Sequence, residues 1–432
     1  MSNYIPNIIF FLILISSMYF FISNLIKLYR NINLGISVDL ETNDNKSIRI
    51  KNMLKIAFGQ SKLISRPISG ILHAVVYVGF IIINIELIEI IIDGLFGTHR
   101  IFSSYLGSFY GFLIATFEIL AISVIVSVLI FWIRRNILKI SRFFGDNMSG
   151  WPKNDANYIL YFEVILMTLF LVMNATDVYF QKTNNGNIIS GYIFNYFSDL
   201  PLSTLHIIER FCWWSHIIGI FMFMNYLYYS KHLHILLAFP NTYYGKVNNL
   251  GKLNNLSTVT SEVKLMMNPD ADVSSEDVDE IPKFGASDIF DLTNLQLLNA
   301  YSCTECGRCT SVCPANITGK KLSPRKVMMD TRDRTEEVSR NIDKNGSFVN
   351  DNKTLINDYV LKEEIWACTS CNACVDECPI SIDPLSIILD MRRYLVMEES
   401  SAPVELNNMM SNIENNGAPW PYNQMDRLNW NE

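Results

Sequence analysis

The chain has 432 residues, of which 50% are hydrophobic and 18% are charged, and its formal net charge is −7. It contains no dense stripe of Lys and Arg, which argues against a nucleic-acid partner. Long apolar runs fill the sequence before residue 240, whereas most of the charge and every cysteine except Cys212 follow it. This division predicts a membrane-embedded part followed by a polar, cysteine-bearing part.

Five apolar runs are long enough to cross a bilayer, because a helix of about 20 apolar residues spans the hydrocarbon core. We predict spans at Tyr4–Leu28, Ile68–Phe96, Leu106–Ile133, Tyr158–Val178 and Ile207–Phe239. The first run has no basic segment before it and no small-residue cleavage site, and Lys27 and Arg30 lie at its end. We therefore expect a retained helix and not a cleaved signal peptide.

The loops after the first and third runs are rich in Lys and Arg, and the other two connecting loops carry few. Basic loops stay in the cytoplasm, so we expect the protein in a cell inner membrane with its N-terminus outside. Five crossings then place everything after Phe239 in the cytoplasm. The cytoplasm is also the reducing compartment that free thiols require.

The cysteines after residue 300 form two copies of one motif. The copies are Cys303-x2-Cys306-x2-Cys309-x3-Cys313-Pro314 and Cys368-x2-Cys371-x2-Cys374-x3-Cys378-Pro379. In such motifs three thiols hold one iron–sulfur cubane, and the fourth, before proline, ligates the other cluster. The predicted ligand sets for two [4Fe–4S] clusters are Cys303, Cys306, Cys309 and Cys378 for one, and Cys313, Cys368, Cys371 and Cys374 for the other.

Zinc and disulfides are the alternatives to iron–sulfur clusters. Zinc sites usually pair two separated C-x2-C knuckles, and the doubled run with a proline after each fourth cysteine fits them poorly. The distance between the motifs and the helix-like segments Leu322–Asn341 and Leu355–Trp366 favour an α-helical ferredoxin domain over a small β-rich one.

The predicted fold class is therefore all-α, a five-helix transmembrane bundle followed by a cytoplasmic α-helical ferredoxin domain. The predicted divisions are a membrane domain at 1–239, a polar linker at 240–282, the ferredoxin domain at 283–397 and an extended tail at 398–432. The tail contains the segment Gly417–Tyr422, which is too rich in proline for a helix.

Histidines in the membrane part are candidate haem ligands, because neutral imidazole binds haem iron well. If the fifth run is one helix, His216 and His234 lie about five turns apart on one face, with His232 nearly opposite. His73, at the start of the second run, should lie at the depth of His234, so this pair is predicted to hold a haem b. A second haem on His216 lacks a partner, since Ile83 occupies the facing region.

Three acidic residues, Glu86, Glu89 and Asp93, recur on one face of the second run. They could exchange protons at a quinone site, or they could only pair with a neighbouring helix or lie at the outer interface. Glu118 and Glu163 are lone acids without an assigned role. Cys212 is expected to be a small buried hydrophobic residue.

The whole chain resembles membrane-bound Fe–S oxidoreductase subunits that fuse a cytochrome b domain, like the nitrate reductase gamma subunit, to a ferredoxin domain of the heterodisulfide reductase type. The resemblance is carried by the doubled cysteine motif and by three membrane motifs. These are Arg66-Pro67 with Gly70 and His73, Trp213-Trp214 with His216, and the run from Tyr229 to His234. The resemblance implies haem ligands on the second and fifth spans and electron exchange with quinone. Dihaem members have a second histidine on the second span, which this sequence lacks.

The leading hypothesis is a membrane-anchored electron-transfer subunit that links a separate cytoplasmic subunit, with a cysteine-rich or flavin centre, to the quinone pool in the lipid bilayer. Relatives carry a further paired-cysteine motif, and no cysteine follows Cys378 here. One rival is a self-sufficient Fe–S oxidoreductase, which the lack of a flavin or nucleotide fingerprint disfavours. The other is a non-redox anchor whose clusters are structural.

Overall fold

A computed structural model describes residues 4–38, 46–183, 186–247, 251–268 and 283–431. Within these ranges the secondary structure is helical and no strand occurs. The predicted all-α fold class is therefore confirmed.

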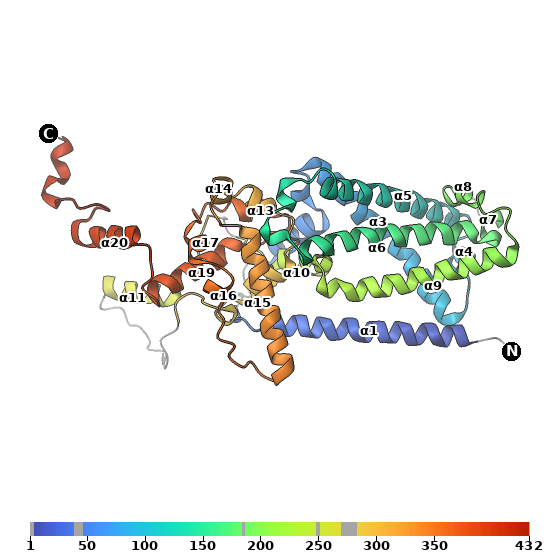
Figure 1. Ribbon diagram of the computed structural model, residues 1–432, viewed down its shortest axis with the longest axis horizontal. Coiled ribbons are helices and arrows are strands. Elements are labelled where there is room, and N and C mark those ends of the chain that lie inside the picture. Colours follow the sequence, from blue (N-terminus) through green and yellow to red (C-terminus); the bar gives the residue numbers. More distant parts are fainter. Residues whose placement is uncertain (1–3, 39–45, 184–185, 248–250, 269–282, 432) are drawn as a thin grey trace.

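Five long helices form a bundle and are apolar enough to cross a membrane. They are α1 (Ile5–Ile32), α3 (Pro67–Phe96), α5 (Ser108–Asn136), α6 (Trp151–Thr176) and α9 (Leu202–Tyr226). The predicted number of five spans agrees with these helices, although α6 begins before the predicted Tyr158 and α9 ends well before the predicted Phe239. Figure 1 shows the helices side by side, with the N-terminus at the end of the bundle that lies farthest from the cysteine-bearing domain.

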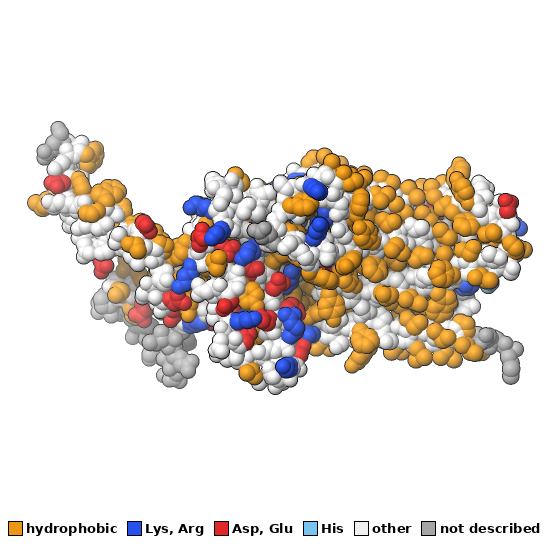
Figure 2. All heavy atoms as spheres, in the orientation of Figure 1, with side chains coloured by type: hydrophobic (Ala, Val, Ile, Leu, Met, Phe, Trp, Pro, Cys, Tyr) orange, Lys and Arg blue, Asp and Glu red, His pale blue; other side chains and the backbone are white. Residues whose placement is uncertain are grey.

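The outer surface of the bundle is apolar, and the charged residues gather on the other half of the molecule (Figure 2). On α1, side chains such as Ile8, Phe11 and Leu12 are about half or more exposed. Water would disfavour this exposure, and a hydrocarbon solvent would not. The bundle therefore has the surface of a membrane-embedded structure.

The fifth predicted span is not one helix, and this part of the prediction is wrong. Helix α9 ends at Tyr226, two 3-10 turns follow (Leu227–Tyr229 and Lys231–Leu233), and a new helix, α10 (His234–Tyr244), begins. Asp155 at the start of α6 causes the break, because its carboxylate accepts hydrogen bonds from the Tyr226 hydroxyl (2.6 Å) and the Lys231 N–H (3.1 Å). Ser230 adds a cap by accepting from the His232 N–H (3.1 Å).

The connecting segments are more helical than predicted. Before α3 lie α2 (Lys46–Met53) and two short turns (Leu54–Phe58 and Ser61–Leu63), and the loops at the end of the bundle away from the cysteine-bearing domain contain α4 (Ile101–Leu106), α7 (Val178–Thr183) and α8 (Ser190–Phe194). The predicted linker includes the end of α10 and all of α11 (Ser257–Met267). Its acidic stretch Ser274–Asp279 lies outside the described residues. The tail is not extended throughout, because α20 (Val404–Asn416) and a 3-10 segment (Gln424–Asn431) flank the proline-containing turn.

The cysteine-bearing domain packs around α15 (Pro324–Asn345) and α19 (Pro384–Met397). Its shorter helices are α12 (Asn294–Ser302), α13 (Arg308–Ser311), α14 (Pro314–Ile317), α16 (Leu355–Asp358), α17 (Lys362–Trp366) and α18 (Ala373–Asp376). The expected helix at 355–366 is thus two short ones, since Asn357 has a left-handed backbone (φ 77°).

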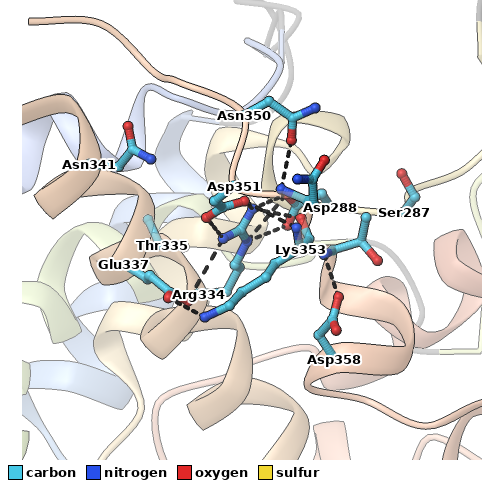
Figure 3. A network of polar contacts seen from close by, with 12 residues as sticks. Ser287, Asp288, Arg334, Thr335, Glu337, Asn341, Asn350, Asp351, Lys353 and Asp358 are labelled. Carbon is cyan, nitrogen blue, oxygen red and sulfur yellow. Dashed lines mark hydrogen bonds and ion pairs between the residues drawn. The ribbon is translucent and has the colours of Figure 1, made fainter. Parts of the chain in front are cut away.

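A buried arginine fastens the long loop after α15. Arg334 is fully buried, and its guanidinium donates to Asp288 (2.8 Å), to Asp351 (2.5 Å) and to the carbonyl of Lys353 (2.8 Å) (Figure 3). Two carboxylates and a carbonyl satisfy the charge that burial would otherwise make costly. The loop and the start of the domain are thereby held against one helix.

The bundle and the cysteine-bearing domain share an extensive polar interface. At the end of α1, Arg30 pairs with Asp343 (2.6 Å) and Asn31 donates to the Tyr301 hydroxyl (3.0 Å). Just beyond, the Ile36 N–H donates to the Leu292 carbonyl (2.8 Å). These contacts fix the domain against the end of the bundle opposite the N-terminus.

Candidate iron–sulfur and haem sites

Each cysteine motif wraps a loop with the same backbone turns. In the first motif Glu305 and Gly307 have positive φ angles (54° and 71°), and in the second Ser370 and Asn372 do (55° and 60°). Left-handed residues turn consecutive backbone N–H groups to one side, which makes concavities that suit anionic Fe–S centres. Accordingly, the Ser370 N–H donates to the Cys368 sulfur (3.4 Å).

Thiols of both motifs influence one another. The pKa of Cys309 is raised by burial and by Cys306, Cys303, Cys378 and Cys374. Burial raises the pKa of Cys374 to about 12, and Cys368, Cys313 and Cys371 add to the shift. These influences are compatible with the predicted sets, in which the fourth cysteine of each motif joins the first three of the other. We call Cys303, Cys306, Cys309 and Cys378 the inner thiol set, and Cys313, Cys368, Cys371 and Cys374 the surface thiol set.

The chemistry of both sets fits [4Fe–4S] clusters. All nine cysteines are free, and burial also raises the pKa of Cys303 to about 12 and of Cys378 to about 11. Buried thiols that repel one another as thiolates need a cationic centre to hold them ionised. In the described residues, no three His, Cys, Asp or Glu side chains are arranged to hold a single metal ion.

The two sets differ in exposure and in surrounding charge. Each set has two buried cysteines, and the sets differ at Cys371, which is exposed, whereas the other two cysteines of the inner set are only partly exposed. The inner set faces the membrane bundle, because Arg308 in its loop donates to the carbonyls of Lys62 (3.1 Å) and Leu63 (3.4 Å), just before α3. Sequence reasoning missed this arginine and its neighbours, and no spacing pattern marks them.

His73 and His234 lie close together at the end of the bundle nearest the cysteine-bearing domain, with ring centroids 6.4 Å apart. The Nδ1–H of His73 donates to the Gln60 side-chain oxygen (3.0 Å), and that of His234 to the Lys231 carbonyl (2.9 Å). These bonds leave both Nε2 atoms with a free lone pair. The predicted pair therefore does come together, although the break after α9 brings it about and not a continuous helix.

His232 does not lie opposite His234, so that prediction is wrong. The 3-10 turn places the two rings 5.5 Å apart, and the His232 ring is 5.9 Å from Phe223. His232 lines an open pocket together with Arg135 and Arg142, and its Nδ1 has no hydrogen-bond partner among the described residues.

His216 is buried, and its Nδ1–H donates to the Leu166 carbonyl (3.0 Å). It lines a pocket with Ile83, Glu86 and Glu163. No histidine stands opposite it there, in agreement with the sequence. The Glu86 carboxylate is buried and one of its oxygens has no partner.

The other membrane acids have structural partners. Glu89 accepts from the Tyr110 hydroxyl (2.7 Å) and the Phe102 N–H (2.8 Å), and Asp93 accepts from the Arg100 N–H (2.6 Å). Glu118 accepts from the Ile189 N–H (2.8 Å). Of the three acids on the second span, only Glu86 is thus available for proton exchange. Cys212 is buried, as expected.

Residues 302–382 match the family model of the 4Fe-4S dicluster domain. The chain thus combines a region that matches the 4Fe–4S dicluster domain with five helices that are long and apolar enough to cross a membrane. The match supports the prediction that this region binds iron–sulfur clusters.

Among curated proteins, the chain is similar to the probable iron-sulfur-binding oxidoreductase FadF of Bacillus subtilis, with 29% identity over 87% of this chain and 54% of the relative. It is 25% identical to the EtfAB:quinone oxidoreductase of Syntrophomonas wolfei, over 91% of this chain and 55% of the relative. A probable membrane-anchored ferredoxin of Chromohalobacter salexigens is 33% identical over 32% of this chain and 23% of the relative.

Heterodisulfide reductase subunits also match over about a quarter to a third of the chain, which agrees with the predicted type of ferredoxin domain. The chain spans about half the length of the first two relatives. No solved structure matches it. The resemblance to the nitrate reductase gamma subunit stays a prediction.

Proposed function

We propose that the chain is the membrane-anchored electron-transfer part of an oxidoreductase, and that it passes electrons between a cytoplasmic partner and the quinone pool. The observation that carries the proposal is the position of the two thiol sets, one exposed through Cys371 and one facing the bundle end where His73 and His234 meet. The similar EtfAB:quinone oxidoreductase supports quinone as the membrane substrate.

We assign one [4Fe–4S] cluster to the inner thiol set and one to the surface thiol set. The exchange of the fourth ligand between the motifs supports this assignment. When bound, the clusters supply one-electron exchange. The chain's own residues hold them, exclude water from the inner set and leave the surface set open to a partner.

We also assign one haem b to His73 and His234. Two imidazoles that bind one iron at about 2 Å from each nitrogen have ring centres about 6 Å apart, and the observed separation is 6.4 Å. Gln60 and the Lys231 carbonyl orient the rings. His216 has no partner histidine, so a second haem is not part of the proposal, and Glu86 is the acid proposed to exchange a proton with quinone.

The proposed donor is a flavin or cysteine-rich centre on polypeptide outside these 432 residues. We retain the orientation inferred from the basic loops, an inner-membrane protein with its N-terminus outside and its clusters in the cytoplasm. The exposed Cys371 is then available to a cytoplasmic donor.

The test is iron, sulfide and haem analysis of the purified full chain. We expect about eight cluster irons and one haem per chain. His73→Ala and His234→Ala should each remove the haem and keep the cluster iron, whereas His206→Ala, at a 74% exposed side chain, should keep both. Zinc in place of iron and sulfide would overturn the cluster assignment, and haem retained in both histidine variants would overturn the haem assignment.

A further inference from the structure

We propose that three arginines, Arg142, Arg308 and Arg325, make the cluster of the inner thiol set more readily reduced than the cluster of the surface set, so that electrons collect beside the membrane. We call these residues the arginine collar. The inference rests on the proposed function, because it requires both clusters, and it adds the direction of electron flow and the residues that set it.

Arg325 at the start of α15 is 3% exposed, and its Nε has no hydrogen-bond partner. Its other nitrogens donate to the Arg142 carbonyl (2.6 Å) and the Asn147 side-chain oxygen (3.0 Å). Burial lowers the pKa of Arg325, and the thiols of the inner set oppose that shift. The guanidinium lies against the first cysteine loop, because a Cβ at Gly307, between Cys306 and Cys309, would be 2.6 Å from an Arg325 nitrogen.

Arg308 and Arg142 complete the collar from two other elements. Arg308, in the first motif, is 3% exposed and donates to the Lys62 carbonyl (3.1 Å) and the Ser65 hydroxyl (3.3 Å). Arg142, in the loop after α5, is half-buried, and its Nε also lacks a partner. Cys306 acts electrostatically on both.

Among the described residues, no aspartate or glutamate forms an ion pair with any member of the collar. The two nearby acids are engaged elsewhere, since Glu305 pairs with Lys231 (2.6 Å) and Arg332 (2.9 Å), and Glu377 pairs with Arg66 (2.8 Å). Buried cations without an anionic partner are strongly disfavoured. An anionic cluster on the inner thiols is the counter-charge that these guanidinium groups fit.

A cluster with four thiolates becomes more negative when it gains an electron, and surrounding charge is one of the factors that set its potential. The collar attracts the reduced form more than the oxidised form and so raises the midpoint potential. Burial disfavours the extra negative charge, but burial also strengthens each attraction, and three unpaired guanidinium groups act together.

The surface set has a different environment. The guanidinium group beside this set belongs to Arg392, which donates to the carbonyls of Ile365 (2.8 Å) and Cys368. A carboxylate lies near each set, Asp383 near Cys374 and Glu305 near Cys303, so the two sets differ in their cations. With one guanidinium in place of three, and with an exposed ligand, this cluster should have the lower potential.

Were both clusters bound, this difference in potential would favour passage of an electron from the surface thiol set to the inner thiol set. The donor would be a reductant on a partner, such as a reduced flavin, which would be oxidised by one electron as the cluster on the surface set is reduced by one. The inner set would then hold the electron beside the segment before α3, where Arg308 donates to the Lys62 and Leu63 carbonyls.

The test is a potentiometric titration of the full chain followed by electron paramagnetic resonance, with Cys371→Ser used to identify the surface-cluster signal. We expect the inner cluster to have the higher midpoint potential. Arg325→Gln and Arg308→Gln should each lower that midpoint and leave the other unchanged, and Arg325→Lys, which keeps the charge, should stay close to wild type. Arg392→Gln should lower only the surface-cluster midpoint.

Lys321→Gln is the control, because Lys321 is an exposed cation whose partner is Glu363. A higher midpoint for the surface cluster, or Gln variants with full iron content and unchanged midpoints, would overturn the inference and leave the proposed function intact. Absence of any reversible cluster signal in the wild type would instead overturn the proposed function itself.

Discussion

Lys231 joins the membrane bundle to the first cysteine loop through one side chain. Its ammonium group donates to Glu305 (2.6 Å) and to the Pro152 carbonyl (2.7 Å), while its backbone N–H binds Asp155. Glu305 is 4% exposed and also accepts from Arg332 (2.9 Å). The loop that carries the inner thiols is thereby tied to the point where α9 ends.

This ion pair should make stability depend on pH. Burial would raise the pKa of Glu305, but Lys231 and Arg332 outweigh it, so its pKa is held below the usual 4.5. The stabilisation is therefore fully present above pH 4.5 and is lost as pH falls through the lowered folded pKa. Glu305→Gln should cost about 3 kcal/mol at pH 7.

The measurement is thermal unfolding of both proteins in detergent from pH 7 to pH 3. The gap between wild type and Glu305→Gln should narrow below pH 4.5. An equal gap across the whole range would show that the carboxylate charge contributes nothing.

Gln60 should control the orientation of His73. Its side-chain oxygen accepts the Nδ1–H of His73 (3.0 Å), which points Nε2 away from it. Removing such an orienting partner commonly costs 10- to 100-fold in metal affinity. Gln60→Leu should therefore lower the haem content or shift the reduced haem absorbance, measured by difference spectroscopy. Gln424→Leu, in the exposed tail, serves as the control, and an unchanged spectrum in Gln60→Leu would exclude the role.

At the scale of single residues, the sequence predicted which residues form the sites better than it predicted the groups that they contact. The cysteines stand out by spacing, and His73 and His234 by depth. The collar could not be predicted, because Arg142, Arg308 and Arg325 come from three separate elements and meet only in the folded molecule. The roles of Glu89 and Asp93 also needed the structure, since each accepts a hydrogen bond from a backbone N–H group as well as from a side chain.

At the scale of elements, the two cysteine loops depend on residues that accept left-handed backbone. Gly307 (φ 71°) is the sharpest case, because a Cβ there would lie 2.6 Å from an Arg325 nitrogen and 2.9 Å from the Arg142 carbonyl oxygen. A left-handed non-glycine residue alone costs about 1–2 kcal/mol. The close contacts of a Cβ at Gly307 could be relieved only by moving the loop.

Gly307→Ala should therefore reduce the iron and sulfide content by about one cluster. Gly319→Ala is the matched control, because Gly319 also has a positive φ (84°) but a Cβ there would meet nothing within 4 Å. Both variants share the backbone strain and only one has the clash. Equal iron contents would show that the close approach at Gly307 is unimportant.

Sequence periodicity could not predict the break between α9 and α10. The apolar run continues from Ile207 to Phe239, and a helix is the default for such a run. The interruption depends on Asp155, which lies far away in the sequence. Ser230 before Lys231 was the one local signal, since serine is a favoured N-terminal cap.

At the scale of the whole molecule, Gly35 allows the connection after α1 to lie against the cysteine-bearing domain. A Cβ at Gly35 would lie 2.5 Å from the Leu292 carbonyl oxygen, which accepts the Ile36 N–H (2.8 Å). Overpacking typically costs about 1–3 kcal/mol. Gly35→Ala should loosen the docked domain while its clusters remain bound.

Hydrogen exchange of the segment around Ile36 and Leu292 is the measurement, and it should become faster in Gly35→Ala. Gly251→Ala is the matched control, because a Cβ there meets nothing within 4 Å. An unchanged exchange rate in Gly35→Ala would show that the close approach at Gly35 does not hold the two segments together.

The overall arrangement was predictable in outline. Hydropathy gave five spans, and cysteine spacing gave the cluster-binding domain after them. The docking of that domain was not predictable, because it depends on pairs such as Arg30 with Asp343 and Arg66 with Glu377 that lie hundreds of residues apart in sequence. Such pairs leave no periodic signal in either partner.

The contacts of α1 have a consequence for biogenesis. Its end, translated within the first tenth of the chain, binds Asp343 and the neighbourhood of Leu292, which the ribosome makes much later. The helix is therefore made before its docking partner exists. Its docking surface stays uncovered until the C-terminal third has been translated and has bound its iron. Iron starvation should then leave an inserted but incompletely assembled protein, exposed to proteases at the junction.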